Sequence, residues 1–193
     1  MTYRIETRNY YLRSAIEILF PQYNHEQDTC IIDLNSCNTL HEVLKYVRRN
    51  SDVERFIFIG NNGMQSRALQ SLISVESNAP LLHCYEKFRH CPGVSYHTAI
   101  EVLLEHRSMG SYSHQDKTTV YSLLLRDSMQ SAARLIGVSN KLFYQRVDRL
   151  SKKLNLRSGL QVHQFFRLEF RPDYVRAKID EHVRVSVTRQ LRL

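Results

Sequence analysis

The stretch SNKLFYQRVDRLSKKLNLRS, residues 139–158, predicts an amphipathic helix with one apolar side and one basic side. Its apolar residues recur at steps of four, three and four: they are Phe143, Val147, Leu150 and Leu154. This spacing places all four on a single stripe of a helix, which we expect to pack against a core. Six Lys and Arg side chains lie in the same stretch, so the opposite side is basic and available to a partner.

The residues just before this stretch predict a second, shorter helix joined to it by a tight turn. MQSAARLI, residues 129–136, has helical spacing, Gly137 suits a helix C-terminus, and Ser139 suits the N-cap of the next helix. The small pair Ala132 and Ala133 lets two helices approach closely. Two helices joined in this way form a helix-turn-helix, whose second helix occupies the major groove of DNA.

The side chains on the outer side of the predicted helix have the chemistry of base and phosphate contacts. Gln can pair bidentately with adenine, an acid can accept from cytosine, and Arg can read guanine. Basic side chains at the edges of such a helix contact phosphates and set the register. The alternative to a DNA-binding role is an ordinary amphipathic surface helix. The predicted DNA-binding set is Lys141, Tyr144, Gln145, Arg146, Asp148, Arg149, Lys152 and Lys153.

The positive charge of the chain belongs entirely to its C-terminal part. The net charge is +8, but residues 1–110 hold 11 basic and 12 acidic side chains, whereas residues 111–193 hold 16 and 7. Such an excess is typical of a segment that binds a polyanion. No nucleophile-base-acid set and no Gly-rich phosphate loop is evident, so we expect neither an enzyme nor a bound cofactor.

Residues 113–168 resemble the LuxR/FixJ-type helix-turn-helix of bacterial transcription regulators. The resemblance rests on SAARLIGVSNKLFYQRVDRLSKKLNLRS, which has the Ala of the scaffold helix, the Gly turn, the Ser cap and the Lys-Leu end of the family pattern. It implies a four-helix domain that binds double-stranded DNA as a dimer on inverted half-sites, with base reading by Tyr144, Gln145 and Asp148. The matching positions are Ala133, Gly137, Val138, Ser139, Leu150, Lys153, Leu154, Arg157 and Ser158.

The chain departs from the family pattern at several places. The usual Leu-Thr-x-Arg-Glu opening is replaced by SHQDK, RDSMQ lacks the Gly that precedes the scaffold helix, and Leu142-Phe143 replace a Thr-Val pair. Asp148 stands where relatives carry a cation or a polar group, and it is placed to pair with Lys152 four residues on. These departures concern the DNA sequence that is recognised more than DNA binding itself.

Residues 1–108 alternate between strand and helix patterns, which predict a parallel α/β sheet with right-handed crossovers. The predicted strands are residues 3–6, 29–34, 55–60 and 79–85, and the predicted helices are residues 10–20, 41–49, 66–74 and 96–106. The boundary to the helical part falls in RSMGSYSHQD, residues 107–116, where Gly and Ser interrupt the apolar pattern. Beyond it, helices are also predicted at residues 117–127 and 161–168.

The resemblance further implies that residues 1–108 are a receiver-like domain, with Asp33 in the place of the phosphorylated aspartate and Lys87 as its lysine. A receiver also holds Mg²⁺ with an acid pair after the first strand, whereas Glu6-Thr7-Arg8 provides a single acid. The chain between residues 7 and 29 is too short for the usual helix, strand and helix. We therefore expect a truncated, degenerate receiver that does not accept phosphate and serves dimerisation or partner binding.

Two readings of Asp33 follow from this. It can be a vestigial phosphoacceptor, or it can be a strand-end acid that hydrogen-bonds a nearby loop or helix cap, which we favour because acids prefer such places.

The cysteines and histidines offer a weak case for metal binding. Cys30 and Cys37 form no CxxC motif with any other cysteine, and an intracellular chain keeps such thiols reduced. His83, His90 and His97, with Cys84 and Cys91 beside two of them, could ligate zinc or copper. We favour no metal, because free cysteine is commonly a small buried hydrophobe.

Residues 169–193 form a basic C-terminal extension beyond the family-like domain. HVRVSVTRQLRL, residues 182–193, alternates apolar and polar side chains, as a strand does. It can be a basic arm that reaches DNA, or an extra strand that packs on a domain or across a dimer. Packing is favoured because Val183, Val185 and Val187 need burial, and the arm would use Arg184, Arg189 and Arg192.

The sequence as a whole predicts a cytoplasmic, nucleoid-associated transcription regulator that binds inverted-repeat promoter sites as a dimer, independently of phosphorylation. The apolar runs are too short for a membrane span, so no membrane partner is expected. The architecture looks like the accessory regulators of enteric bacteria that control capsule, fimbriae or acid resistance. The alternative is a protein-binding accessory factor or antagonist, which pairs with a related regulator and has little specific DNA binding.

Overall fold

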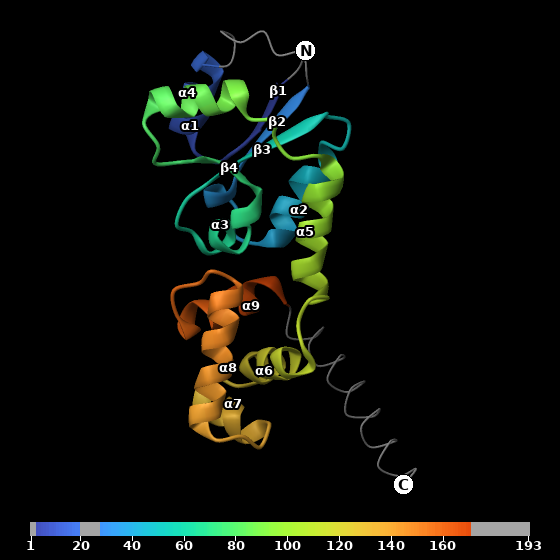
Figure 1. Cartoon of the computed structure of the whole chain (residues 1–193), viewed down its shortest axis with the longest axis vertical. Coiled ribbons are helices and arrows are strands. Elements are labelled where there is room, and N and C mark those ends of the chain that lie inside the picture. The colour runs from blue at the N-terminus through green and yellow to red at the C-terminus, as the bar shows by residue number, and fades with distance from the viewer. Residues whose placement is uncertain (1–2, 20–27, 171–193) are drawn as a thin grey trace. The chain divides into compact units, whose positions relative to one another are not determined.

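The computed structural model describes residues 3–19 and 28–170 of the 193-residue chain (Figure 1). The chain divides into two compact units, Met1–Gly110 and Ser111–Leu193, called unit 1 and unit 2 here. The predicted strand at residues 182–193 lies outside the described residues. No helix in the described ranges is long and apolar enough to cross a membrane.

Unit 1 is built on a four-stranded parallel sheet with the strand order β1-β2-β3-β4. The strands are β1 (Tyr3–Glu6), β2 (Thr29–Asp33), β3 (Arg55–Gly60) and β4 (Ile73–Glu76). Every residue of the two central strands is buried, which fits the near-continuous apolar runs TCIID and RFIFIG, since parallel strands are covered on both faces. The α/β prediction for this half of the chain is therefore confirmed.

Helices cover both faces of this sheet, α1 (Tyr10–Leu19) and α4 (Leu81–His90) on one, α2 (Leu40–Arg49) and α5 (Tyr96–Ser108) on the other (Figure 1). On the first face, Ile16 of α1 and Phe88 of α4 pack in a cluster with Ile5, Ile31 and Ile57. On the second face, the ring of Phe56 lies 6.5 Å from that of Tyr96, and α2 packs against α5.

The connections of the sheet do not all have the same hand. The chain moves in one direction from β1 to β2 to β3, yet α1 and α2 lie on opposite faces (Figure 1). The crossovers β1-α1-β2 and β2-α2-β3 therefore run in the same direction along the sheet but over opposite faces. Two such crossovers have opposite hands, so one of them is left-handed. The expectation of uniformly right-handed crossovers is wrong at this point.

Two predicted elements of unit 1 are corrected by the structure. The helix predicted at residues 66–74 is a short helix α3 (Met64–Ala68) and a 3₁₀ turn, η3 (Gln70–Leu72), followed by strand β4. The strand predicted at residues 79–85 belongs instead to helix α4. A short apolar run fits a strand or a buried helix equally well. Here the alternating sequence ISVE supplies the edge strand, and Pro80 precedes the first turn of α4.

Unit 2 is helical throughout its described residues. Its helices are α6 (His114–Leu125), α7 (Met129–Leu135), α8 (Asn140–Lys153) and α9 (Gly159–Glu169). Helix α6 starts before the predicted residue 117, because Ser113 and Asp116 form a capping box that satisfies the free N–H groups of the first turn. Helix α8 packs against the other three helices. The helical prediction for residues 113–168 is therefore confirmed.

Candidate nucleic-acid interface

The turn between α7 and α8 is fixed by two residues that the sequence singles out. Gly137 has a φ of 65°, which favours glycine because a side chain there is strained. The N–H of Gly137 donates to the carbonyl of Arg134 at 3.1 Å, and that of Val138 donates to Ala133 at 3.1 Å, the Schellman pattern at a helix end. Ser139 then caps α8, since its side chain accepts from the N–H of Leu142 at 3.3 Å.

The inner side of α8 is the predicted apolar stripe. Phe143, Val147, Leu150 and Leu154 are all buried, with at most 2% of their surface exposed. Ala132 and Ala133 of α7 are fully buried as well, as expected of small residues where two helices approach closely. The orientation of α8 is therefore as predicted.

Five residues of the predicted DNA-binding set share the outer side of α8, called the outer stripe here: Lys141, Tyr144, Gln145, Asp148 and Lys152. All are exposed, and at 3.6 residues per turn they fall within an arc of about 100°. Lys152 pairs with Asp148 at 2.7 Å, as predicted from their spacing. The side chains of Lys141, Tyr144 and Gln145 make no hydrogen bond or ion pair within the described residues. Their donors and acceptors are thus available to a partner.

The other three residues of the set lie on a flank of α8 that turns toward the start of unit 2. Arg149 donates from Nη2 to Oδ1 of Asp116 at 2.8 Å. Lys153 donates from Nζ to the carbonyl of Ser111 at 2.5 Å, and the same Nζ lies 4.3 Å from the ring centroid of Tyr112. Both cations therefore stabilise the unit itself.

Arg146, the third residue of this flank, is half-buried. Its Nε is buried without a hydrogen-bond partner among the described residues.

Acidic side chains in the described part of unit 2 pair locally with some of its many cations. Residues 111–170 contain ten Lys and Arg against four Asp and Glu. Three of these acids are paired: Asp116 with Arg149, Asp148 with Lys152, and Asp127 with Arg167 at 2.6 Å. Residues 111–170 therefore keep an excess of positive charge on the cations outside these three pairs.

Asp116 is ionised at neutral pH despite its burial. Burial raises the pKa of its carboxyl group, but hydrogen bonds from Ser113 and the guanidinium of Arg149 outweigh that effect and hold the pKa below its ordinary value. The resulting carboxylate anchors the flank of α8 to the first turn of α6. The capping motif Ser-x-x-Asp at residues 113–116 was a local signal of this anchor.

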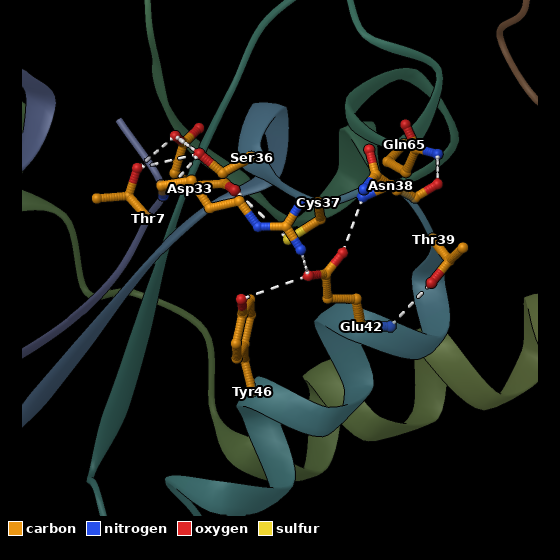
Figure 2. Close-up of polar contacts among 10 residues, drawn as sticks. Thr7, Asp33, Ser36, Cys37, Asn38, Thr39, Glu42, Tyr46 and Gln65 are labelled. Carbon is orange, nitrogen blue, oxygen red and sulfur yellow. Dashed lines mark hydrogen bonds and ion pairs between the residues drawn. The ribbon is translucent and has the colours of Figure 1, made fainter. Parts of the chain in front are cut away.

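In unit 1, Asp33 is buried at the end of β2 and its carboxylate is occupied by structural hydrogen bonds (Figure 2). Oδ2 accepts from the hydroxyl of Thr7 at 2.7 Å and from that of Ser36 at 2.5 Å. Oδ1 accepts from the N–H of Asn35 at 3.0 Å, which caps the short 3₁₀ helix η2 (Leu34–Ser36). These contacts are those of the strand-end acid that caps a helix.

Glu42 lies next to this group and its carboxylate contacts three other residues (Figure 2). Its carboxylate accepts from the guanidinium of Arg8, from the N–H of Asn38 at 3.0 Å and from the hydroxyl of Tyr46 at 3.5 Å. Arg8, the cation that follows β1, is therefore bound by Glu42. It lies in the segment after β1 where a receiver would have its magnesium-binding acid pair. Lys87 lies within α4, so it does not follow a strand as the receiver reading required.

The cysteines and histidines do not form a metal centre among the residues that the structure describes, where no three His, Cys, Asp or Glu side chains gather. All four thiols are free. Burial raises the pKa values of Cys30 and Cys37 to about 12, so both thiols stay protonated and unreactive near neutral pH. His83 and His90 lie on α4, and His97 lies on α5.

No protein-family model matches the chain, and no curated protein matches it in sequence.

Proposed function

We propose that the chain is a transcription regulator whose unit 2 binds double-stranded DNA, with α8 as the recognition helix of a helix-turn-helix formed by α7 and α8. The observation that carries the proposal is the outer stripe of α8, which presents free hydrogen-bonding groups on a capped helix beside a tight Gly137 turn. Gln145 reads an adenine edge, and Lys141 contacts phosphate. A dimer places two such helices in successive major grooves, about one helical turn apart.

The resemblance to LuxR/FixJ-type regulators supports this proposal through the same residues. Ala133, Gly137 and Ser139 act in the structure in the roles that the family pattern assigns to them: a small helix contact, a left-handed turn residue and a cap. Residues 113–168 are then the DNA-binding domain, residues 1–108 a receiver-like domain, and residues 169–193 a basic extension. Such a regulator acts in the bacterial cytoplasm, at the nucleoid.

The strand order of unit 1 supports a truncated receiver. One class of doubly wound folds has five parallel strands in the order 2-1-3-4-5, numbered along the chain. If strand 2 is lost, the remaining four strands lie side by side in chain order, as β1 to β4 do here. In that fold the helix after the first strand and the helix between the third and fourth strands lie on opposite faces, because right-handed crossovers in opposite directions require it. The same loss explains why α1 and α2 lie on opposite faces here.

The surroundings of Asp33 support phosphorylation-independent action. Three hydrogen bonds hold its carboxylate, and the residue after Glu6 and Thr7 is a cation engaged by Glu42. A phosphoryl transfer to Asp33 would have to break these bonds without the magnesium-binding acid pair of a receiver.

The proposal is tested by binding purified full-length protein to fragmented bacterial genomic DNA at roughly physiological salt, because low salt inflates nonspecific binding. Sequencing of the bound fragments should reveal promoters that share an inverted repeat. On that repeat, Gln145→Ala should lose affinity by about 1–3 kcal/mol and relax the base preference at one position. Gln164→Ala, an exposed glutamine on α9, is the matched control. Uniform recovery of all fragments would refute specific recognition.

The second candidate, a protein-binding accessory factor or antagonist, is favoured by an exposed apolar surface on α1. Tyr10, Tyr11 and Ile18 expose 73%, 84% and 68% of their surfaces, and exposed apolar residues that lie together on one helix can form an interaction surface. Such a surface suits a homodimer or a heterodimer with a related regulator.

Light scattering of the purified protein at several concentrations separates these roles. If self-association is lost in the double variant Tyr11→Ser, Ile18→Ser, α1 is a homodimer surface, as the proposed DNA-binding regulator requires. A monomeric wild-type protein with salt-sensitive, nonspecific DNA affinity would favour the accessory factor.

A further inference from the structure

A polar cavity of about 520 Å³ lies along the free edge of the sheet in unit 1. Strand β4 forms one wall, and the others come from the loop after β3, from α3 and η3, and from α4. The volume falls within the range of about 300–1,000 Å³ that is usual for small-molecule sites. Gly60 and Glu76, which end β3 and β4, both line it, and open α/β sheets bind ligands outside the carboxyl ends of their strands.

The lining of the cavity matches a hydrophilic ligand. Among the described residues that line it, Ile73 is the one apolar side chain. Four amides and two hydroxyls face it from different elements: Asn61, Asn62, Asn78, Gln70, Ser66 and Ser74. Such groups both donate and accept hydrogen bonds, as the hydroxyl groups of a sugar or polyol require.

Two basic residues lie at one end of the same cavity. His83 and Lys87 lie four residues apart on α4, so their side chains are neighbours on the helix surface. Neither side chain makes a hydrogen bond or an ion pair within the described part of the chain. Both also line a second cavity that continues along α4.

The remaining charged residues of the cavity are Arg67 on α3 and Glu76. The guanidinium of Arg67 is held in place by Asn62, to which it donates from Nε to the carbonyl at 3.1 Å and from Nη2 to Oδ1 at 2.7 Å. Glu76 is the one acid among the described lining residues. Positive groups therefore outnumber negative ones, which favours an anionic ligand.

We propose that this cavity binds a small, hydroxyl-rich phosphate ester such as a sugar phosphate. Lys87 contacts the phosphate as a point charge, Arg67 adds a guanidinium whose planar geometry matches phosphate oxygens, and the amides hold the hydroxyl groups. The site is separate from Asp33, which does not line the cavity. It does not depend on the proposed DNA binding.

Isothermal titration calorimetry of the full-length protein tests the proposal, with glucose 6-phosphate and ribose 5-phosphate as ligands and with glucose and inorganic phosphate for comparison. At least one ester should bind saturably with a Kd of about 1 mM or tighter, and both comparison compounds should bind at least about tenfold more weakly, a difference of about 1.4 kcal/mol. Lys87→Met should weaken ester binding by a similar factor. Lys45→Met, an exposed lysine on α2 outside the cavity, should bind as the wild type does.

Three results would each overturn the proposal. The first is the absence of saturable binding by both esters. The second is equal ester affinity of Lys87→Met and the wild type, which would place any binding elsewhere. The third is equally tight binding of inorganic phosphate, which would deny a role to the amide-rich wall. Because Lys87 is exposed, its substitution is not expected to unfold unit 1, and circular dichroism of both variants checks this.

Discussion

Arg149 in α8 donates a hydrogen bond of 2.8 Å to Asp116, the residue whose carboxylate also closes the capping box at the start of α6. The two residues are 33 positions apart in the chain. The bond joins the basic flank of α8 to the start of α6, where the capping box of Ser113 and Asp116 satisfies N–H groups that a helix start otherwise leaves free. Arg149 is thus a residue that orients the proposed recognition helix, whatever contact with DNA it makes in addition.

We expect Arg149→Met to lower the free energy of unfolding of unit 2 by about 1 kcal/mol, the usual net contribution of one hydrogen bond. The buried carboxylate of Asp116 keeps Ser113 as a partner, which limits the loss. Urea unfolding followed by circular dichroism measures the change. Arg157→Met, an exposed cation of the loop after α8, is the control, and an equal loss in both variants would argue against the bond.

The same carboxylate predicts a pH dependence. The pKa of Asp116 is lower in the folded protein than its ordinary value of 3.8, so the folded state binds this proton less readily than the unfolded state. Its stabilisation is therefore fully present above that ordinary value and is lost as the pH falls through the lowered folded pKa. The difference in unfolding free energy between wild type and Asp116→Asn should be constant near neutral pH and shrink in acid. A difference that grows in acid would contradict this.

Gly137→Ala should destabilise unit 2 by about 1–2 kcal/mol, because an alanine side chain is strained at a positive φ. No atom lies within 4 Å of the position that its Cβ would take, so backbone strain and not a clash is the cause. Gly137→Asn should cost less, since asparagine tolerates the left-handed region better. Denaturant unfolding of both variants ranks them, and equal losses would indicate that contacts rather than conformation decide.

The two lysines at opposite ends of α8 should behave differently. Lys141→Ala should weaken binding to all DNA sequences and reduce the slope of log affinity against log salt by about 1, as loss of one phosphate contact does. Lys153→Ala should chiefly lower stability, because it removes the contacts with Ser111 and Tyr112. Fluorescence anisotropy across a salt series, paired with thermal unfolding, separates them. A full salt-slope effect with unchanged stability for Lys153→Ala would reverse this assignment.

Asp33 should matter for folding and not for signalling. Asp33→Ala leaves the hydroxyls of Thr7 and Ser36 and the N–H of Asn35 without their acceptor, and we expect a loss of about 2 kcal/mol or more in unfolding free energy. Asp33→Asn keeps one acceptor oxygen and should lose less. Incubation with acetyl phosphate and Mg²⁺ should add no phosphoryl group by mass spectrometry. A phosphorylated peptide containing Asp33 would refute phosphorylation-independent action.

The parts of the fold that the sequence predicted correctly are those encoded by local signals. The apolar stripe of α8 follows from helical periodicity, and the turn before it follows from Gly137 and Ser139, whose roles depend on neighbouring backbone alone. The exchange of strand and helix at β4 and α4 was missed because a short apolar run satisfies either element. The choice depends on which segment completes the sheet, which is a tertiary contact.

The candidate site was predictable only in part for a similar reason. The helical spacing placed Lys141, Tyr144 and Gln145 outward correctly. It could not show that Arg149 and Lys153 face the start of α6, because the position of a neighbouring helix is not encoded in the periodicity of α8. The capping motif at residues 113–116 predicts a helix start, but not the cation that joins it.

The contact of Lys153 with the carbonyl of Ser111 bears on how unit 2 can be isolated. A fragment that begins at Ser113, where the family-like segment starts, would lack both the carbonyl and the ring of Tyr112, which also packs 6.1 Å from Phe166. Tyr112 is buried, so its removal opens the side of α9 to water. A fragment of this half that keeps both contacts of Lys153 therefore begins no later than Ser111.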